Sequence, residues 1–333
     1  MAVAPRLPPE LLLKILATSS RSTLLSASLV SRDWRGPAQD VLESRLSLPT
    51  PKVARAWLAC PGRKTRSRRL SLGAGISRQE AEAVFDTVDG LEELAVLAPP
   101  NAKAKFDVRA LQSKQLSGLT HLHLLAPLTD TSPSEPLDLP FALSFLRCKG
   151  LYRAFPSAAV SALASASQST LRGLDLDCYG SNAEAFISAL APVAGSVTDL
   201  ELHGSDRQTP ALLSFLSSSS ALTTLTCWEA SVPLLQSLPP SLANLSILKN
   251  YVFHSEAPYE ELLSRSGLLR RAAFRSLTFG GISIATLRAQ IGGEELLEEC
   301  QERGIEVEFG VEAAGRYGTL PFGWPSFGGM KVA

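Results

Sequence analysis

The stretch Leu171-Arg172-Gly173-Leu174-Asp175-Leu176 shows the pattern on which most of the chain is built. Its apolar residues alternate with other residues at the end of the stretch, which is typical of a short strand with one buried face. Full or shortened copies of this stretch recur along the chain, with Val, Ile, Phe or Cys at some positions. The central apolar residues of the ten copies are Leu70, Leu94, Leu122, Leu146, Leu174, Leu200, Leu225, Leu245, Leu277 and Val307.

The spacing of these copies indicates the fold. Consecutive copies lie about 26 residues apart, within the range of roughly 20 to 29 residues that leucine-rich repeats span. The intervals 77–87, 107–116, 158–166, 182–194, 209–216 and 259–271 are predicted helices, several of which start at a capping residue. A unit of one strand and one helix can bury its apolar face only against the neighbouring units. We therefore predict an α/β solenoid over residues 67–310.

The repeats resemble leucine-rich repeats only in part. The stretch Leu242-x-x-Leu245-x-Ile247-x-x-Asn250 carries the full pattern with its terminal Asn, whereas most other copies lack that Asn. The resemblance therefore implies an irregular leucine-rich-repeat horseshoe. The proline-rich segment 130–140 is predicted to be a loop that protrudes from the repeats.

A second pattern lies at the N-terminus. Leu7-Pro8-x-Glu10-Leu11-Leu12 opens a predicted helix, since proline is tolerated at the first helical turn. Apolar residues continue at helical spacing through a second and a third short helix. So small a bundle cannot bury this many large apolar side chains, and it contains no cysteine that could form a disulfide. A partner helix across the surplus leucines is the simplest explanation.

The ordered set Leu-Pro-x-Glu-Leu-Leu-x-x-Ile-Leu, Leu-Leu and Leu-Val-Ser-Arg-x-Trp resembles an F-box, over roughly residues 5–48. F-box helices dock on the Skp adaptor of cullin-based (SCF) ubiquitin ligases, and many fungal proteins combine an F-box with such repeats. The resemblance implies a small all-α, three-helix F-box in front of the solenoid. The implied adaptor-binding residues are Leu7, Pro8, Leu11, Leu12, Ile15, Leu16, Leu25, Leu29, Val30 and Trp34.

An alternative remains for this N-terminal region. The helices could be an ordinary cap of the solenoid, with no ligase involved. The two interpretations differ in whether Leu7, Pro8, Ile15, Leu16 and Trp34 are buried within the chain or exposed to a partner.

The remaining segments of the chain complete the predicted domain organisation. Residues 1–48 form the F-box, and residues 49–66 form a linker rich in proline and basic residues. The basic run 63–69 is either a solvated connector, a nuclear-import signal or a phosphate-binding patch. Residues 311–333, rich in Gly, Pro and aromatic residues, are predicted to be a disordered tail, with an end cap or a short docking motif as alternatives.

The composition excludes several classes of partner. Lys and Arg together number 32, as do Asp and Glu, so nothing in the net charge favours nucleic acid or an acidic membrane. No apolar stretch is long enough to span a bilayer. The five cysteines are widely spaced and are predicted to be reduced thiols of an intracellular protein, located in the cytoplasm, the nucleus or both.

The sequence also lacks the motifs of catalysis. It contains no G-x-S-x-G, Walker loop or H-E-x-x-H, so we predict neither enzymatic activity nor a cofactor. His121 and His123 share one strand face, but no Cys or carboxylate completes a zinc site beside them. We predict no metal.

The concave face of the solenoid is the predicted substrate surface, because the residues between the buried leucines point to it. Strand alternation puts four carboxylates on this face, and we expect them to bind a basic peptide segment with Trp228 as the anchor. The alternative is that these charges are merely solvated. The candidate residues are Asp175, Asp177, Asp199, Glu201, His203 and Trp228.

The resemblance implies a function for the whole chain. It would be the substrate-recognition subunit of an SCF-type ligase, holding an unknown protein substrate on the repeats and the Skp adaptor, and through it the cullin, on the N-terminal helices. It would direct ubiquitin-dependent degradation without catalysing a step. The alternative is a leucine-rich-repeat interaction scaffold outside any ligase.

Overall fold

The computed structural model describes residues 8, 11–12, 15–16, 19, 21–30, 32–60, 62, 64–98, 103–149, 156–177, 183–203, 209–228, 230–248, 267–289 and 292–310. The N-terminal part is helical, with residues 11–12 and 15–16 followed by α2 (Arg21–Val30) and α3 (Arg32–Glu43). These helices share a small core of their own. Its members are Leu12, Leu16, Leu24, Ala27, Ala38 and Val41.

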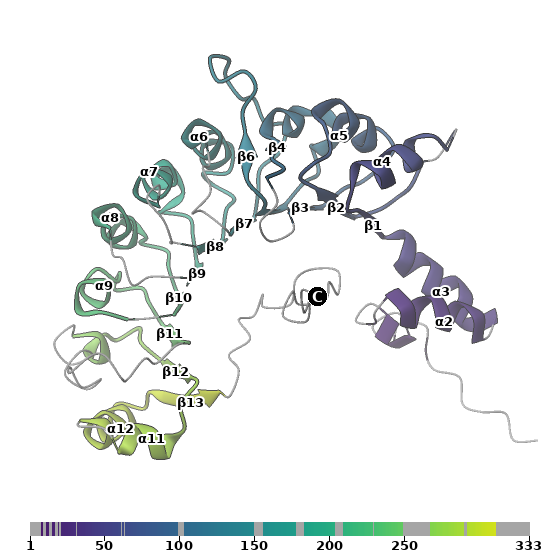
Figure 1. Cartoon of the computed structure of the whole chain (residues 1–333). Coiled ribbons are helices and arrows are strands. Elements are labelled where there is room, and N and C mark those ends of the chain that lie inside the picture. Colours follow the sequence, from purple (N-terminus) through teal and green to yellow (C-terminus); the bar gives the residue numbers. More distant parts are fainter. Residues whose placement is uncertain are drawn as a thin grey trace, which may run out of the picture.

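The rest of the described chain is built on one curved parallel sheet of eleven strands, each of which pairs with the next along the chain (Figure 1). This sheet confirms the prediction of an α/β solenoid. Its strands are β1 (Arg45–Leu48), β2 (Arg69–Gly73), β3 (Glu93–Leu97), β5 (His121–Leu125), β7 (Phe145–Cys148), β8 (Gly173–Asp177), β9 (Asp199–His203), β10 (Thr224–Cys227), β11 (Asn244–Ile247), β12 (Ser276–Gly280) and β13 (Glu306–Gly310).

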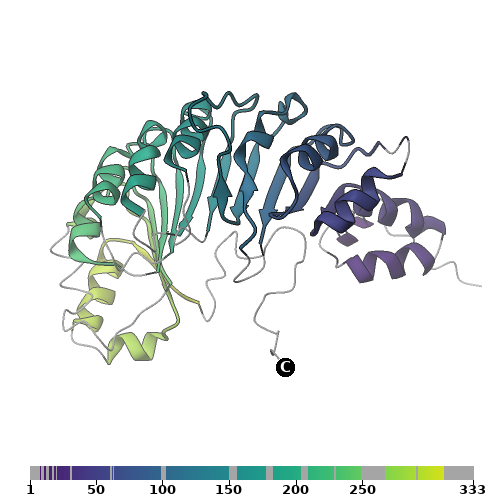
Figure 2. The same ribbon diagram turned by 45° about the horizontal axis from the view of Figure 1, so that its top comes forward.

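Helices cover the outer, convex side of this sheet and leave the inner, concave side to the strands (Figures 1 and 2). Several helices begin at side-chain caps. Ser77, Asp107 and Thr209, with which three of the predicted helices start, each accept a hydrogen bond from a backbone N–H of the first turn. The convex elements are α4 (Pro51–Leu58), α5 (Arg78–Phe85), η1 (Val108–Gln112), η2 (Lys114–Leu116), α6 (Ser157–Ala166), α7 (Ala183–Ala189), η3 (Ala191–Val193), α8 (Pro210–Ser218), α9 (Val232–Gln236), η4 (Leu268–Arg270), α11 (Ile284–Arg288) and α12 (Gly293–Glu302).

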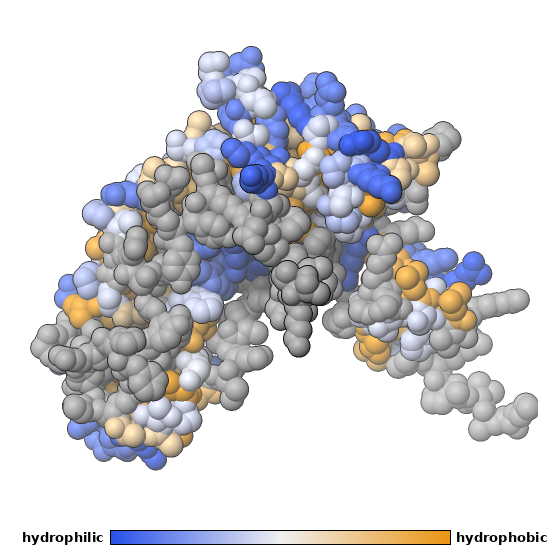
Figure 3. Space-filling model, in the orientation of Figure 1, coloured by the Kyte–Doolittle hydropathy of each residue, from blue (hydrophilic) through white to orange (hydrophobic). Residues whose placement is uncertain are grey.

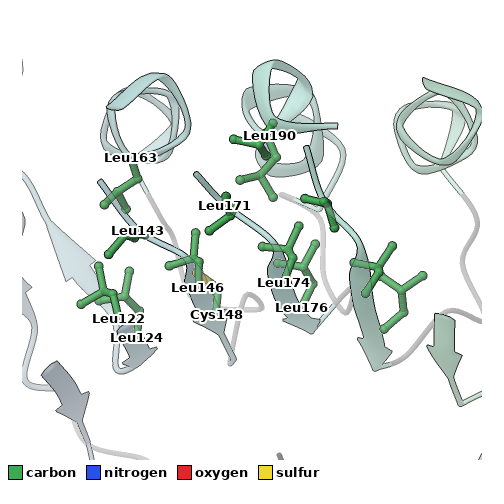
Figure 4. Packing of buried hydrophobic residues seen from close by; sticks show 14 of the residues in the cluster. Leu122, Leu124, Leu143, Leu146, Cys148, Leu163, Leu171, Leu174, Leu176 and Leu190 are labelled. Atoms are coloured by element: carbon green, nitrogen blue, oxygen red, sulfur yellow. The ribbon is translucent and has the colours of Figure 1, made fainter. Parts of the chain in front are cut away.

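The strand register explains why the leucines recur. Leu174 pairs with Leu146 on one side and with Leu200 on the other, and Leu176 pairs with Cys148 and Leu202 in the same way. Two rows of apolar side chains therefore run along the sheet and pack against the helices. Figure 4 shows this packing in the central repeats. Each buried leucine contributes roughly 2 kcal/mol. The leucines that recur in the sequence are therefore the residues that form this core.

The predicted start of the repeats at residue 67 is wrong. β1 pairs in register with β2, Leu46 with Leu70 and Leu48 with Leu72, so the solenoid begins at Arg45. The predicted linker 49–66 contains α4, which opens with the Thr50 cap and Pro51 at its first turn. The prolines around residue 50 mark a strand-to-helix turn rather than an unstructured connector.

Three further segments differ from the predictions. Residues 107–116 form two 3-10 helices, η1 and η2, in place of one α-helix. The helix predicted at 182–194 ends at residue 189 and is followed by η3, which begins at Ala191. A two-stranded sheet of β4 (Phe106–Asp107) and β6 (Leu128–Thr129) holds the base of the loop at 130–140. Much of the predicted helix at 259–271 and the whole tail 311–333 lie outside the described residues.

No helix within these described ranges has the length and the apolar character that crossing a bilayer requires.

Candidate interaction surfaces

The N-terminal helices expose an apolar surface. The exposed fraction is 48% for Leu11, 48% for Ile15, 50% for Leu25 and 87% for Leu29. Figure 3 shows apolar residues on the surface of this part of the molecule. Large apolar side chains that are exposed together in this way mark an interaction site.

The ten predicted adaptor-binding residues separate into three groups. Pro8 is exposed, as are the four residues above. Leu12 and Leu16 lie in the core of the helices, so their placement on the partner surface is wrong. The helical spacing of the leucines did not distinguish the face that packs inward from the face that points to solvent.

The remaining three predicted residues include Trp34, which is half-buried and packs against this core. It lies in the first turn of α3. Leu7 and the side chain of Val30 lie outside the described residues.

The centre of the concave face carries an aromatic and imidazole cluster, in which Phe145 and His123 are buried and His121 is exposed. The ring centroid of Phe145 lies 5.9 Å from that of His121 and 5.4 Å from that of His123. Gly173 is the neighbour of Phe145 on the next strand, and a Cβ at Gly173 would lie 2.6 Å from a Phe145 ring carbon. The glycine therefore makes room for the ring, which covers the adjacent strand.

Beside this cluster lies a buried ion pair between two neighbouring strands. Arg147 Nε is 2.5 Å from Asp175 Oδ2, and Lys149 Nζ is 3.4 Å from the same oxygen. Burial alone would raise the pKa of Asp175, but the hydrogen bond from His203 and the charges of Lys149 and Arg147 outweigh it and lower that pKa. Asp175 is therefore an ionised carboxylate neutralised within the protein.

The next strand extends this network. His203 Nε2 lies 2.8 Å from Glu201 Oε1 and 3.2 Å from Asp175 Oδ1, and the His203 ring lies 5.6 Å from that of Trp228. Burial would lower the pKa of His203, but its contacts with Asp175 and Glu201 outweigh burial and raise it. His203 therefore connects Asp175 on β8 and Glu201 on its own strand β9 with Trp228, which follows β10.

Asp175, Glu201 and His203 bring together three atoms of the types that ligate metals, all within 4.8 Å of one another. Lys149 Nζ lies 3.1 Å from His203 Nε2, so an ammonium group already stands beside these atoms. Arg147 and Lys149 supply the positive charge that a metal ion would bring. The arrangement is a charge network made by the protein's own side chains.

The structure brings the six predicted substrate residues to one face, as strand alternation implied, but it does not make them one acidic patch. Asp175 has no exposed surface and Glu201 is 6% exposed, whereas Asp177, Asp199, His203 and Trp228 are half-buried. The expectation that all four carboxylates meet the substrate is therefore wrong for Asp175. Sequence reasoning missed the role of Arg147 and Lys149, although the register signal was present: Arg147 is one strand away from Asp175, at the same position of the repeat.

The basic run 63–69 also divides into two parts. Arg68 and Arg69 form ion pairs with Glu92 and Glu93 of the next repeat, at 3.7 and 3.0 Å. Lys64 and Arg66 are exposed and have no ion pair within the described part of the chain. Arg68 and Arg69 therefore belong to the solenoid. The nuclear-import interpretation stays a prediction for the remainder, and Arg63 lies outside the described residues.

The protruding loop at 130–140 is held by one buried arginine. Arg109 Nε and Nη2 donate to the two carboxylate oxygens of Asp130, at 2.7 and 3.2 Å, and its guanidinium also donates to the carbonyl groups of Ser132, Glu135 and Pro136. The Asp130 contact raises the pKa of Arg109, and that of Asp130 is lowered in turn. The loop is thus an ordered projection from the convex side.

Taken together, the exposed apolar helices and the polar concave sheet define a protein built for interactions. The family model described as F-box-like matches residues 4–48, so the N-terminal helices form an F-box-like domain, in front of a leucine-rich-repeat-like solenoid. Both modules are typically non-catalytic.

No curated protein matches the chain in sequence. A solved structure with a similar outline is the leucine-rich repeat-containing protein LegL7 from Legionella pneumophila, which is 15% identical to this chain. The alignment covers 79% of this chain and 88% of that chain, with a TM-score of 0.44.

Proposed function

We propose that this chain is a substrate-recognition subunit of an SCF-type ubiquitin ligase. The F-box-like helices bind a Skp-type adaptor, and through it the cullin, while the concave face of the solenoid holds a protein substrate. The chain itself catalyses no step. Its contribution is to keep substrate and ligase on one molecule, so that ubiquitin transfer proceeds at the effective concentration of an intramolecular reaction.

The observation that carries this proposal is the exposed apolar surface inside the F-box-like match. Leu11, Ile15, Leu25 and Leu29 are exposed although they belong to the residues 4–48 that match the family model. Leaving four large aliphatic side chains in water is unfavourable by roughly 1.5–3 kcal/mol each relative to full burial. An apolar partner surface would recover much of that free energy.

The alternative, that these helices cap the solenoid, has less support. A cap would share the apolar core of the repeat that it covers. The core of the helices and the core of the solenoid are instead two separate clusters with no residue in common. The separation favours a module that faces outward.

The decisive experiment is co-purification of the full chain with a recombinant Skp adaptor. The variant Leu25→Asp with Leu29→Asp changes two exposed residues of α2 and should reduce adaptor affinity at least tenfold while the unfolding temperature stays within a few degrees of the native value. The matched control is Val53→Asp with Ile284→Asp, two exposed apolar residues of the solenoid, which should leave adaptor binding intact. Equal adaptor affinity in all three proteins, or no binding by the native chain, would refute the proposal.

The substrate surface that we propose is the concave region around His203 and Trp228. Asp177 and Asp199 leave this region acidic even after Arg147 and Lys149 are counted against Asp175 and His203 is counted against Glu201. Half-buried Trp228 beside His203 offers the large aromatic surface that interaction hot spots favour. A basic substrate segment fits this region, with Asp199 and Glu201 mainly affecting the rate of association.

A further inference from the structure

A second surface lies where the N-terminal helices join the solenoid. A cavity of about 690 Å³ opens there, lined by Leu42 of α3, by the strand β1, by Val53, Ala56 and Trp57 of α4, and by residues 64–67. This volume is within the range of roughly 300–1,000 Å³ that ligand sites occupy. No residue of the lining is acidic.

The walls of this cavity are apolar and its rim is positive. Leu46 and Trp57 are half-buried, and Val53 is 40% exposed. These residues belong to the first repeat of the solenoid, whose outer face is not covered by a preceding repeat. Lys64 and Arg66 stand on the rim, with no ion pair to any described residue. Burial and the neighbouring charge of Arg69 lower the pKa of Arg45, which also lines the cavity. An anionic ligand would be stabilised here.

One side of the cavity is formed by β1, the edge strand of the sheet. β1 is the first strand in the sheet order, and among the described strands it pairs only with β2. Arg69 N–H donates to the carbonyl of Ser44, so residues 44, 46 and 48 face β2 and the N–H and C=O of Ser47 face the open edge. Ser47 is half-buried, and within the described structure its backbone groups have no partner. Such an edge is a template for an added strand.

We propose that this edge is a docking site for an extended, acidic peptide segment of a partner protein, which adds a strand beside β1 and places alternate apolar side chains in the cavity. Strand addition satisfies the backbone groups of Ser47, and the pockets beside the edge select the side chains. Carboxylates of the peptide meet Lys64 and Arg66. The site is distinct from both the adaptor surface and the concave face.

The chain's own termini do not provide this segment. Residues 1–7 contain Arg6 and no carboxylate side chain, and residues 311–333 contain Glu312 against Arg316 and Lys331. Nucleic acid fits the site less well, because its walls are apolar and the chain has no net positive charge. The occupant that we propose is a segment of another protein.

The test begins with phage display of random octapeptides on the full chain. We expect enrichment of peptides in which acidic and apolar residues alternate, with Kd at least tenfold weaker for the variant Lys64→Glu with Arg66→Glu. The control Lys114→Glu with Arg270→Glu changes the net charge equally at distant exposed positions and should keep the native Kd. Both variants alter exposed side chains, so folding is expected to be preserved.

The backbone contact is tested separately. An enriched peptide should slow hydrogen exchange in the fragment 45–50. Ser47→Pro, which removes the outward N–H together with the hydroxyl that accepts from Ser71 Oγ, should abolish binding, whereas Ser47→Ala, which removes the hydroxyl alone, should keep it. Failure of any acidic peptide to be enriched, equal Kd in the Lys64 and Arg66 variant, or protection of other strands instead of 45–50 would overturn the proposal. Displacement of the peptide by a single-stranded oligonucleotide would also overturn it. Because the adaptor assay uses different residues, either proposal can fail without the other.

Discussion

Arg147 and Asp175 form a buried ion pair across neighbouring strands, with Nε 2.5 Å from Oδ2, at the centre of the concave face. Both occupy the same position of the repeat, so parallel register alone places them side by side. Two charges removed from water need each other, because the loss of one leaves the other uncompensated. This pair converts part of the predicted substrate surface into a structural element of the solenoid.

We expect Asp175→Asn to destabilise the solenoid by about 3–5 kcal/mol, since it leaves Arg147 buried without its carboxylate. Urea unfolding followed by circular dichroism measures this change. Asp177→Asn, on the same strand but half-buried, is the matched control and should cost less than about 1 kcal/mol.

Replacing both members of the pair, Arg147→Met with Asp175→Leu, should cost less than Asp175→Asn alone, because no buried guanidinium is left without its carboxylate. A double variant that is no more stable than the single variant would show that the pair is not the source of the effect.

His203 should make the stability of the solenoid depend on pH. Its pKa is raised above the ordinary value of about 6.5, so its contribution is complete below about pH 6.5 and disappears as the pH rises through the folded-state pKa. We expect His203→Gln to reduce the free energy of unfolding more at pH 5.5 than at pH 8, as measured by urea titration.

The pH control is His121→Gln. Burial lowers the pKa of His121, whereas the pKa of His203 is raised, so the two variants should change stability with pH in opposite directions. Protonation of His121 at low pH opposes folding. Relative to the native chain, the free energy of unfolding of the His121→Gln variant should therefore be higher at pH 5.5 than at pH 8. If both variants shift stability in the same direction with pH, the assigned charge network is incorrect.

Leu16→Asp should unfold the N-terminal helices. Leu16 is 1% exposed in their small core, and a carboxylate there is either buried or forces the core open, at a cost of several kcal/mol. We expect loss of adaptor binding together with loss of protease resistance in residues 1–43, measured by limited proteolysis.

Leu29→Asp, at a position that is 87% exposed, should instead keep protease resistance. Equal resistance of the Leu16 and Leu29 variants would contradict the division into buried and exposed faces.

Arg109→Met should release the projecting loop. The guanidinium donates to Asp130 and to three backbone carbonyls of residues 132–136, and methionine fills similar space without any donor. We expect new proteolytic cleavage between residues 130 and 138. Arg109→Lys should not restore protection, because one ammonium cannot reproduce the fork of the guanidinium. Uncut loops in both variants would show that the loop is held by other contacts.

Much of this protein can be predicted from its sequence. The spacing of Leu94, Leu122, Leu146 and their equivalents indicates parallel strands, because only a stacked repeat buries the same positions at so regular an interval. The F-box-like stretch is likewise local, since its helices depend on neighbouring residues of one short segment. Strand alternation also assigns residues such as Asp199 and Trp228 correctly to the concave face.

The tertiary structure decides what those residues do. Asp175 and Asp177 are equivalent in sequence terms, but only register shows that Arg147 and Lys149 neutralise the first. Leu16 and Leu29 are both leucines of a helical stripe, and only packing shows that one is core and the other surface. Burial and charge compensation depend on segments far apart in the chain. Local sequence therefore specifies the repeat, whereas the assembled solenoid sets the charge and the exposure of each side chain.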